Sequence, residues 1–265
     1  MKVVLTVAGS DSGGGAGIQA DLRTFAAHGV HGTSAITAVT AQNSVAVLDW
    51  VALDPRMVVA QMEAVASDMP VAAVKTGMLA TAAIVTAVAE AIQRLRLPLV
   101  VVDPVMVAKS GDRLLDRDAE TAYRERLLPL ASVVTPNLPE AEALLGGPVR
   151  TLPEMREAAR ALHALGPRAV VVKGGHLEGD AVDVFWDGER LEDLPAPRIA
   201  TPNTHGTGCT YSAAIATHLG AGLPLEEAIM NAKRFLTEAI RAGVAVGRGR
   251  GPTDPFFFLR GKNRA

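Results

Sequence analysis

Apolar runs alternate with amphipathic segments along most of this chain. Runs rich in valine and alanine, which are typical of strands buried on both faces of a parallel sheet, lie at residues 2–8, 33–41, 71–78, 99–105, 130–135 and 168–176. Helical patterns lie between and after them, at residues 18–27, 55–69, 81–95, 116–128, 152–165, 211–219 and 225–242. This alternation predicts an α/β fold with a mostly parallel central sheet flanked by helices on both faces.

The edges of the predicted sheet differ from its centre. Residues 45–51 show the pattern of a short additional strand, and residues 182–186 and 190–194 flank Asp187-Gly188, a turn pair that favours a small β-hairpin. Residues 256–258 are all phenylalanine, and we expect them to pack on the core, with an oligomer surface as the alternative. Since no internal repeat or linker interrupts the pattern, we expect one domain over residues 1–265.

Composition narrows the class of protein. The chain has 265 residues, 49% of them hydrophobic, which is enough to bury a substantial core. Its net charge is −2 and no dense basic block is present, so we expect neither nucleic acid nor a membrane as partner. Cys209 is the single cysteine, which excludes intramolecular disulfides and favours the cytoplasm. No signal peptide or membrane span is expected, so a small-molecule ligand fits best.

A glycine-rich segment, residues 203–210, precedes the apolar helical run at residues 211–219. Gly206 and Gly208 allow a tight bend, and Thr204 or Thr207 is a candidate helix cap. The unpaired N–H groups and the dipole at a helix N-terminus attract anions, so this segment is a candidate phosphate site. The alternative is an ordinary capped turn.

A second glycine-rich loop, residues 9–17, joins the first predicted strand to the first helix. It does not match the dinucleotide-binding pattern G-x-G-x-x-G in register, because position 18 is isoleucine. The loop therefore indicates only that a group approaches the backbone closely. Asp21, in the first turns of the following helix, is either a solvated acid or a ligand contact, and the pattern does not choose between them.

Polar side chains follow the predicted strands at their carboxyl ends, where open α/β sheets bind ligands. They are Gln42, Asp103, Asn137, Glu140 and Lys173. A cation, carboxylates or amides that can hold Mg²⁺, and preorganised N–H donors are the groups that phosphoryl transfer requires. A P-loop motif is absent, which argues against a P-loop enzyme. The loop at residues 106–112 is expected to be mobile, because its residues offer little to pack.

Seven short motifs occur in order along the chain, at residues 14–21, 41–43, 75–79, 105–112, 135–140, 173–176 and 203–209. They read GGAGIQAD, AQN, KTGML, VMVAKSGD, TPNLPE, KGGH and NTHGTGC. With these motifs the chain resembles the ribokinase-like superfamily, and within it the hydroxymethylpyrimidine/phosphomethylpyrimidine kinases of thiamine biosynthesis.

The resemblance implies a ribokinase-like fold and an activity. Such an enzyme uses ATP and Mg²⁺ to phosphorylate 4-amino-5-hydroxymethyl-2-methylpyrimidine to its monophosphate and then to the diphosphate. A homodimer is also implied. The implied contacts with the aminopyrimidine are Gly9, Asp21, Gln42, Met78, Val105 and Cys209. The implied contacts with ATP are Thr135, Asn137, Lys173, Gly206, Thr207 and Gly208, and those with the metal are Glu140 and Asp103.

Cys209 occupies a position at which the resemblance leaves two mechanisms open. Most ribokinase-like sugar kinases have an aspartate as general base at this position, as the resemblance implies. A cysteine at a helix N-terminus can have a lowered pKa and accept the hydroxyl proton as a thiolate. Alternatively, positioning and charge neutralisation dominate, because phosphorylation of a phosphate needs no strong base.

The sequence is also compatible with two other functions. The nearest is a pyridoxal or pyridoxine kinase of the same branch. The other, from a different class, is a non-catalytic pyrimidine-binding regulatory protein that kept the fold.

Overall fold

A computed structural model describes residues 1–106, 117–175, 177 and 179–260. Nine strands form one sheet in the order β3-β2-β1-β4-β5-β6-β7-β8-β9. The strands are β1 Val3–Asp11, β2 His31–Gln42, β3 Val47–Ala52, β4 Val71–Thr76, β5 Val100–Val102, β6 Val133–Val134, β7 Val170–Val172, β8 Asp183–Trp186 and β9 Leu191–Leu194. Each segment predicted as a strand overlaps one of them.

The centre of the sheet is parallel and its edges are antiparallel. Strands β2, β1, β4, β5, β6 and β7 pair in parallel. Strand β3 pairs antiparallel with β2, and β8 and β9 form an antiparallel hairpin beside β7. The mostly parallel sheet and the small hairpin predicted from the sequence are confirmed.

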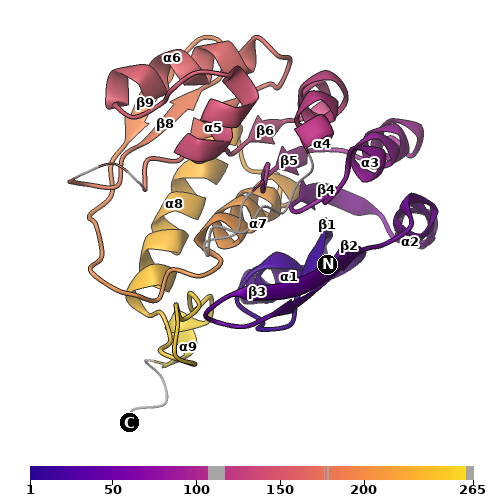
Figure 1. The fold of residues 1–265 in the computed structure, drawn as a ribbon, viewed down its shortest axis with the longest axis horizontal. Helices are drawn as coiled ribbons and strands as arrows, with labels where there is room; N and C mark the ends of the chain where they lie inside the picture. Colours follow the sequence, from indigo (N-terminus) through magenta and orange to yellow (C-terminus); the bar gives the residue numbers. More distant parts are fainter. Residues whose placement is uncertain (107–116, 176, 178, 261–265) are drawn as a thin grey trace.

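Helices cover both faces of the sheet (Figure 1). They are α1 Gly17–Ala27, α2 Pro55–Asp68, α3 Ala82–Arg94, α4 Arg117–Ala122, α5 Leu138–Leu145, α6 Leu152–His163, α7 Thr207–Gly220, α8 Leu225–Arg241 and α9 Phe257–Arg260. After α4 the chain continues as a π-helical turn, Tyr123–Leu127, and a 3₁₀ turn, Leu128–Leu130. The helix predicted at 116–128 is therefore irregular in its second half. Among the described helices, none is long and apolar enough to cross a membrane.

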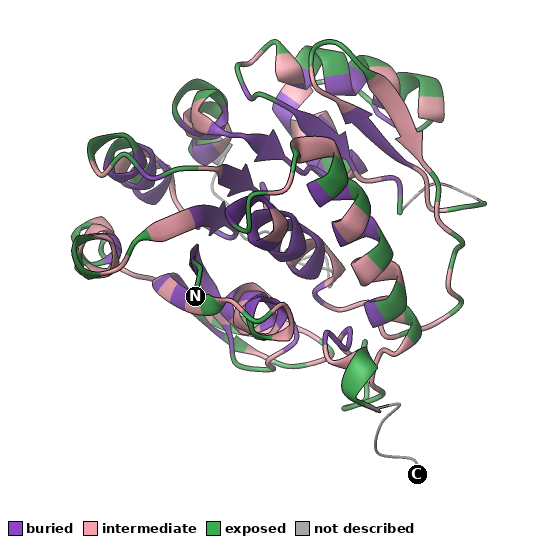
Figure 2. Cartoon of the chain, turned by 180° about the vertical axis from the view of Figure 1, so that it is seen from behind, coloured by how far each residue is buried: buried purple, intermediate pink, exposed green. Residues whose placement is uncertain are grey.

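Two hydrophobic cores lie on opposite faces of the sheet. One includes Val58 of α2 and Ile84 of α3 and continues over α5 and α6. The other includes Phe25 of α1 and Tyr211 and Ile215 of α7. Figure 2 shows the result, with the central strands and α7 largely buried and the outer surface of α8 exposed.

The C-terminal phenylalanines only partly follow the prediction. The ring of Phe257 lies 5.5 Å from that of Phe235 on α8, which is the expected packing on the body of the protein. Phe258, in contrast, is 43% exposed.

The order of strands determines where a ligand can bind. The chain passes from β1 through α1 to β2 on one side of β1, and later through α2 to β4 on its other side. Helices α1 and α2 contribute to the cores on opposite faces, so the connections diverge between β1 and β4. In open α/β sheets such a switch point leaves a crevice at the carboxyl ends of the strands.

Candidate active site

A cavity of about 680 Å³ lies at the carboxyl ends of the parallel strands. Asp11 ends β1, Met78 follows β4, Asp103 follows β5, Asn137 follows β6 and Lys173 follows β7, and all of them line the cavity. The start of α7 and one side of α8 complete the wall. The structure therefore brings the predicted polar strand ends to one edge, as expected from the parallel order.

Helix α7 begins at the cavity without a side-chain cap. Gly206 is the N-cap residue at φ +74°, so the proposal that Thr204 or Thr207 caps this helix is wrong. A β-carbon at Gly206 would lie 1.8 Å from the carbonyl oxygen of Gly15, because the two glycine loops pack back to back. Residues 206–209 line the cavity, which leaves the first-turn N–H groups of α7 available to an anion.

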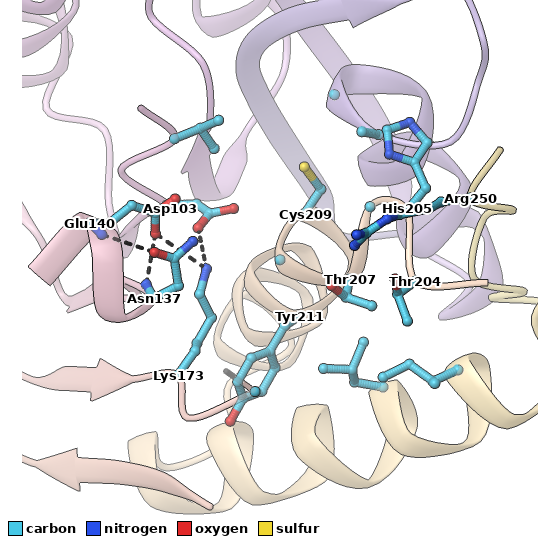
Figure 3. A pocket seen from close by; sticks show the side chains of 18 of the residues that line it. Asp103, Asn137, Glu140, Lys173, Thr204, His205, Thr207, Cys209, Tyr211 and Arg250 are labelled. Atoms are coloured by element: carbon cyan, nitrogen blue, oxygen red, sulfur yellow. Dashed lines mark hydrogen bonds and ion pairs between the residues drawn. The ribbon is translucent and has the colours of Figure 1, made fainter. Parts of the chain in front are cut away.

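A buried group of charges faces that helix start (Figure 3). Lys173 Nζ lies 2.8 Å from Asp103 Oδ1 and 3.8 Å from Glu140 Oε2. The Ser212 hydroxyl, from the second turn of α7, donates to Asp103 Oδ2 at 3.2 Å. A β-carbon at Gly208 would lie only 3.2 Å from Lys173 Nζ, so glycine lets α7 approach the lysine closely. Lys173 and the N-terminus of α7 therefore face the same part of the cavity.

The two carboxylates of this group differ in charge. Burial opposes ionisation of Asp103, but attraction by Lys173 and Lys75 and its hydrogen bonds hold its pKa below the ordinary value. Burial raises the pKa of Glu140 to about 7, with Lys173 offsetting part of the rise and Asp103 adding to it. At neutral pH Asp103 is therefore ionised, whereas Glu140 is partly protonated.

Asn137 and Glu140 also build the start of α5. Asn137 Oδ1 accepts from the Glu140 backbone N–H at 2.9 Å, and Glu140 Oε2 accepts from the Asn137 N–H at 2.7 Å. This capping box fixes both side chains at the cavity edge. No group of three or more His, Cys, Asp or Glu side chains suited to a metal occurs in the described part of the chain. Mg²⁺ needs only one or two carboxylates when phosphates supply other ligands, so Glu140 and Asp103 fit that ion.

Thr135, predicted to face ATP, is not among the residues that line the cavity. It is fully buried, and its hydroxyl lies 3.3 Å from Asp103 Oδ1 as donor. Strand β6 ends one residue before it, which places the side chain behind Asp103. Thr135 thus supports a carboxylate of the site, and its contact with ATP stays a prediction.

Most residues predicted to contact the pyrimidine line the other part of the cavity. These are Gly9, Gln42, Met78, Val105 and Cys209. A β-carbon at Gly9 would lie 3.1 Å from the Met78 sulfur, so glycine keeps this wall compact. Amide, thioether, aliphatic and thiol groups together suit a flat heteroaromatic ring with polar substituents.

Asp21 is the exception among these residues. It is fully buried, which contradicts the solvated alternative, and it does not line the cavity. Its Oδ2 accepts from the Thr6 hydroxyl at 2.6 Å and pairs with Lys75 Nζ at 2.9 Å. Asp21 is therefore the counter-ion of a buried lysine that lines the cavity, and the predicted direct contact with substrate is not supported.

The thiol of Cys209 is not activated. Burial raises its pKa to about 11, and attraction by Lys75 and the Gly17 N–H group offset only part of this effect. The helix N-terminus was expected to lower the pKa, but desolvation dominates. At neutral pH the thiol is protonated, which argues against the thiolate hypothesis.

Sequence reasoning missed several residues that line the cavity. Asp11 Oδ2 lies 2.9 Å from His205 Nε2 and accepts from the N–H groups of Gly15 and Ala16, which ties the first glycine loop to the start of α7. Arg250 enters from the C-terminal segment. The alternation of glycine and arginine at residues 247–251 was the available signal for Arg250.

An apolar part of the cavity wall was also not predicted. Ala196, Pro197 and Ile199 line it together with Leu236 and Ile240 of α8. The charges near this apolar wall form an ion pair, since Lys233 Nζ lies 2.6 Å from Asp183 Oδ2. These residues lie on elements whose relative positions depend on long-range packing, so no local pattern identifies them.

Comparison with known proteins assigns the chain to a family. The phosphomethylpyrimidine kinase family model matches residues 11–254. The chain belongs to this family. A hydroxymethylpyrimidine/phosphomethylpyrimidine kinase of Synechococcus elongatus is 50% identical over 98% of this chain and 99% of that protein. The thiamine biosynthesis bifunctional protein ThiED of Geobacter sulfurreducens is 54% identical over 95% of this chain, which spans only 51% of that relative.

Solved structures of related kinases have the same fold. The ADP complex of Bacillus subtilis pyridoxal kinase has a TM-score of 0.92 at 43% identity and covers 98% of this chain and 99% of its own. Phosphomethylpyrimidine kinase of Clostridium difficile has a TM-score of 0.81 at 40% identity, over 91% of this chain and 100% of its own. The predicted ribokinase-like fold is confirmed.

Proposed function

We propose that this protein is an ATP-dependent kinase of hydroxymethylpyrimidine and of its monophosphate in thiamine biosynthesis, acting as a single kinase domain over residues 1–265. The observation that carries the proposal is the cavity itself. It joins the charged group of Asp103, Glu140 and Lys173 to a wall suited to a heteroaromatic ring, with the open N-terminus of α7 between them.

The charged part of the cavity supports ATP as phosphoryl donor. The apolar wall formed by Ile199, Leu236 and Ile240 suits a purine base, and Asn137 and Lys173 line the same cavity. Lys173 neutralises phosphate charge, and the N–H groups of residues 206–208 stabilise charge that develops on the transferred group. Glu140 and Asp103 would hold Mg²⁺ directly or through water. When bound, Mg²⁺ supplies further neutralisation of phosphate charge.

The remaining wall supports the pyrimidine as acceptor. The Gln42 amide can pair with a ring nitrogen and an amino group, while Met78 and Val105 pack on the ring. Cys209 lies at the start of α7, where the acceptor oxygen must approach the phosphoryl group. Because its thiol stays protonated, we assign it to lining the pocket. Orientation and charge neutralisation then provide the rate acceleration in both steps.

Pyridoxal is a second candidate acceptor, favoured by the structural likeness to pyridoxal kinases. Pyridoxal kinase of Staphylococcus aureus in complex with AMP-PCP and pyridoxal has a TM-score of 0.91 at 35% identity. A substituted pyridine with a hydroxymethyl group has the same general shape as the pyrimidine. A regulatory protein without catalysis is disfavoured, because the complete charged group would serve no purpose there.

We further propose a homodimer located in the cytoplasm. Apolar side chains exposed at one edge of the sheet support the dimer, among them Val39 of β2 and Val51 of β3. The single cysteine supports a reducing compartment.

A competition assay with purified protein, ATP and Mg²⁺ tests the choice of acceptor. Hydroxymethylpyrimidine and pyridoxal are supplied together, and phosphorylated products are resolved by chromatography. We expect the pyrimidine phosphates to predominate. Turnover of pyridoxal alone would instead support the second candidate, and calorimetry showing no ATP binding would support the regulatory protein.

A further inference from the structure

Arg250 is a cavity-lining cation whose charge the mechanism above does not use. Its side chain is exposed and extends from the C-terminal segment toward Thr207 at the start of α7 (Figure 3). The guanidinium makes no hydrogen bond or ion pair with any residue that the structure describes. Its five N–H donors are therefore available to a ligand.

The other cavity-lining cations of the described residues are already engaged. Lys75 pairs with Asp21, Lys173 with Asp103 and Lys233 with Asp183, and the imidazole of His205 contacts Asp11. Arg198 donates to three backbone carbonyls, those of Gly175, Leu177 and Gly179. Arg250 thus adds positive charge that no nearby group offsets.

The backbone around Arg250 is held on both sides. The N–H of Arg250 donates to the Ser44 carbonyl at 2.9 Å, and the Gly251 carbonyl accepts from the His205 N–H at 3.0 Å. A β-carbon at Gly249 would lie 2.0 Å from the Ser44 carbonyl oxygen, and one at Gly251 would lie 2.1 Å from that of Val244. The flanking glycines therefore permit the close packing that places the Arg250 backbone beside the β2–β3 turn and the segment that precedes α7.

We propose that Arg250 binds a phosphate group at the N-terminus of α7, either of ATP or of the phosphorylated pyrimidine. A guanidinium recognises phosphate through two parallel hydrogen bonds, and the first-turn N–H groups of α7 present donors to the same anion. This inference rests on the proposed function, because the phosphates come from its two substrates.

Steady-state kinetics of Arg250→Gln test the proposal, since glutamine removes the charge but keeps a polar side chain. Arg248→Gln is the matched control, because Arg248 is exposed in the same loop but does not line the cavity. KM is measured for hydroxymethylpyrimidine, for its monophosphate and for ATP with each acceptor. Arg250→Lys tests rescue by charge, and thermal melting confirms that each variant is folded.

The KM values distinguish the two sources of phosphate, ATP and the pyrimidine monophosphate. If Arg250 binds the pyrimidine phosphate, Arg250→Gln raises KM for the monophosphate about fivefold or more, with a smaller effect on hydroxymethylpyrimidine. If it binds ATP, KM for ATP rises by a similar factor with both acceptors. In either case Arg250→Lys recovers part of the loss, because charge returns without the bidentate geometry.

The proposal is overturned if all KM values of Arg250→Gln stay within twofold of those of Arg248→Gln. It is also overturned if only KM for the uncharged hydroxymethylpyrimidine rises. Failure of the proposed function has a different signature, namely a wild-type protein that phosphorylates neither pyrimidine. Calorimetric titration with ATP and with inorganic phosphate then tests Arg250 directly, and equal affinities in wild type and Arg250→Gln contradict the proposal.

Discussion

At the scale of single residues, desolvation and not the helix dipole decides the state of Cys209. Its pKa of about 11 predicts that iodoacetamide alkylates the folded protein slowly at pH 7 and that the rate rises with pH. The measurement is unambiguous because the chain contains no other cysteine. Cys209→Ala should retain the rates of both phosphorylation steps within a few-fold.

An alkylation midpoint near or below the ordinary thiol pKa, about 8.5, would contradict this account of Cys209. So would loss of the first phosphorylation step alone in Cys209→Ala, because that step is the one in which a base can take a hydroxyl proton.

Glu140 should impose an acid limb on activity. Its pKa of about 7 means that the carboxylate needed for Mg²⁺ is lost as pH falls through neutrality. We predict that kcat/KM for ATP declines with an apparent pKa near 7, and that Glu140→Gln removes this limb and lowers the plateau. Glu157→Gln, on the exposed face of α6, is the control. An unchanged limb in Glu140→Gln would assign the titration to another group.

The raised pKa of Glu140 affects the stability of the folded protein in the opposite direction from its effect on activity. The folded-state pKa of Glu140 lies above the ordinary 4.5, so the folded protein binds this proton more tightly than the unfolded chain does. The contribution of this group is fully present below about pH 4.5 and is lost as pH rises through about 7. The site therefore keeps a buried carboxylate at a cost to stability where the enzyme would be active.

At the scale of elements, the glycine that begins α7 should be the most sensitive backbone position. Gly206 and Gly146 have almost the same φ, +74° and +75°, but only a β-carbon at Gly206 meets another group, the Gly15 carbonyl. Gly146→Ala should therefore show only the cost of a strained φ, about 1 kcal/mol. Gly206→Ala should also displace the start of α7 and lower kcat by about 100-fold.

Thermal melting and single-turnover kinetics of the two alanine variants measure this difference. Equal losses of activity in Gly206→Ala and Gly146→Ala would show that the packing of the two glycine loops does not control the site. If Gly206→Ala does not fold, Gly15→Ala tests the same contact from the other loop, because a β-carbon at Gly15 would lie 2.2 Å from the His205 ring.

The sequence predicted the elements of this fold well, because buried parallel strands and amphipathic helices have distinct local patterns. It also placed Asp103, Asn137, Glu140 and Lys173 together, since the carboxyl ends of parallel strands share one edge. What it could not predict depends on side-chain direction and burial. Asp21 pairs with Lys75, and Thr135 lies behind Asp103, because tertiary packing covers both positions.

At the scale of the whole molecule, the free edge of the sheet predicts self-association. Val39 and Val51 are register partners on β2 and β3, and they are 44% and 59% exposed. Burying such a pair against a second copy would remove apolar surface from water. We expect sedimentation at micromolar concentration to give the mass of two chains and Val51→Arg to give that of one.

Met230→Arg, on α8 away from this edge, should leave the mass unchanged and serves as the control. A wild-type protein that sediments as a single chain throughout the concentration range would contradict the dimer. A dimer that persists in Val51→Arg would instead show that the interface lies on another surface of the protein.

One cavity is proposed to perform two successive phosphoryl transfers to the same pyrimidine. The most direct measurement incubates the purified protein with hydroxymethylpyrimidine, ATP and Mg²⁺ and resolves the products over time. We expect the monophosphate to appear first and the diphosphate to follow, with one ADP formed per phosphate transferred. Absence of both pyrimidine phosphates from a folded protein that binds ATP would contradict it.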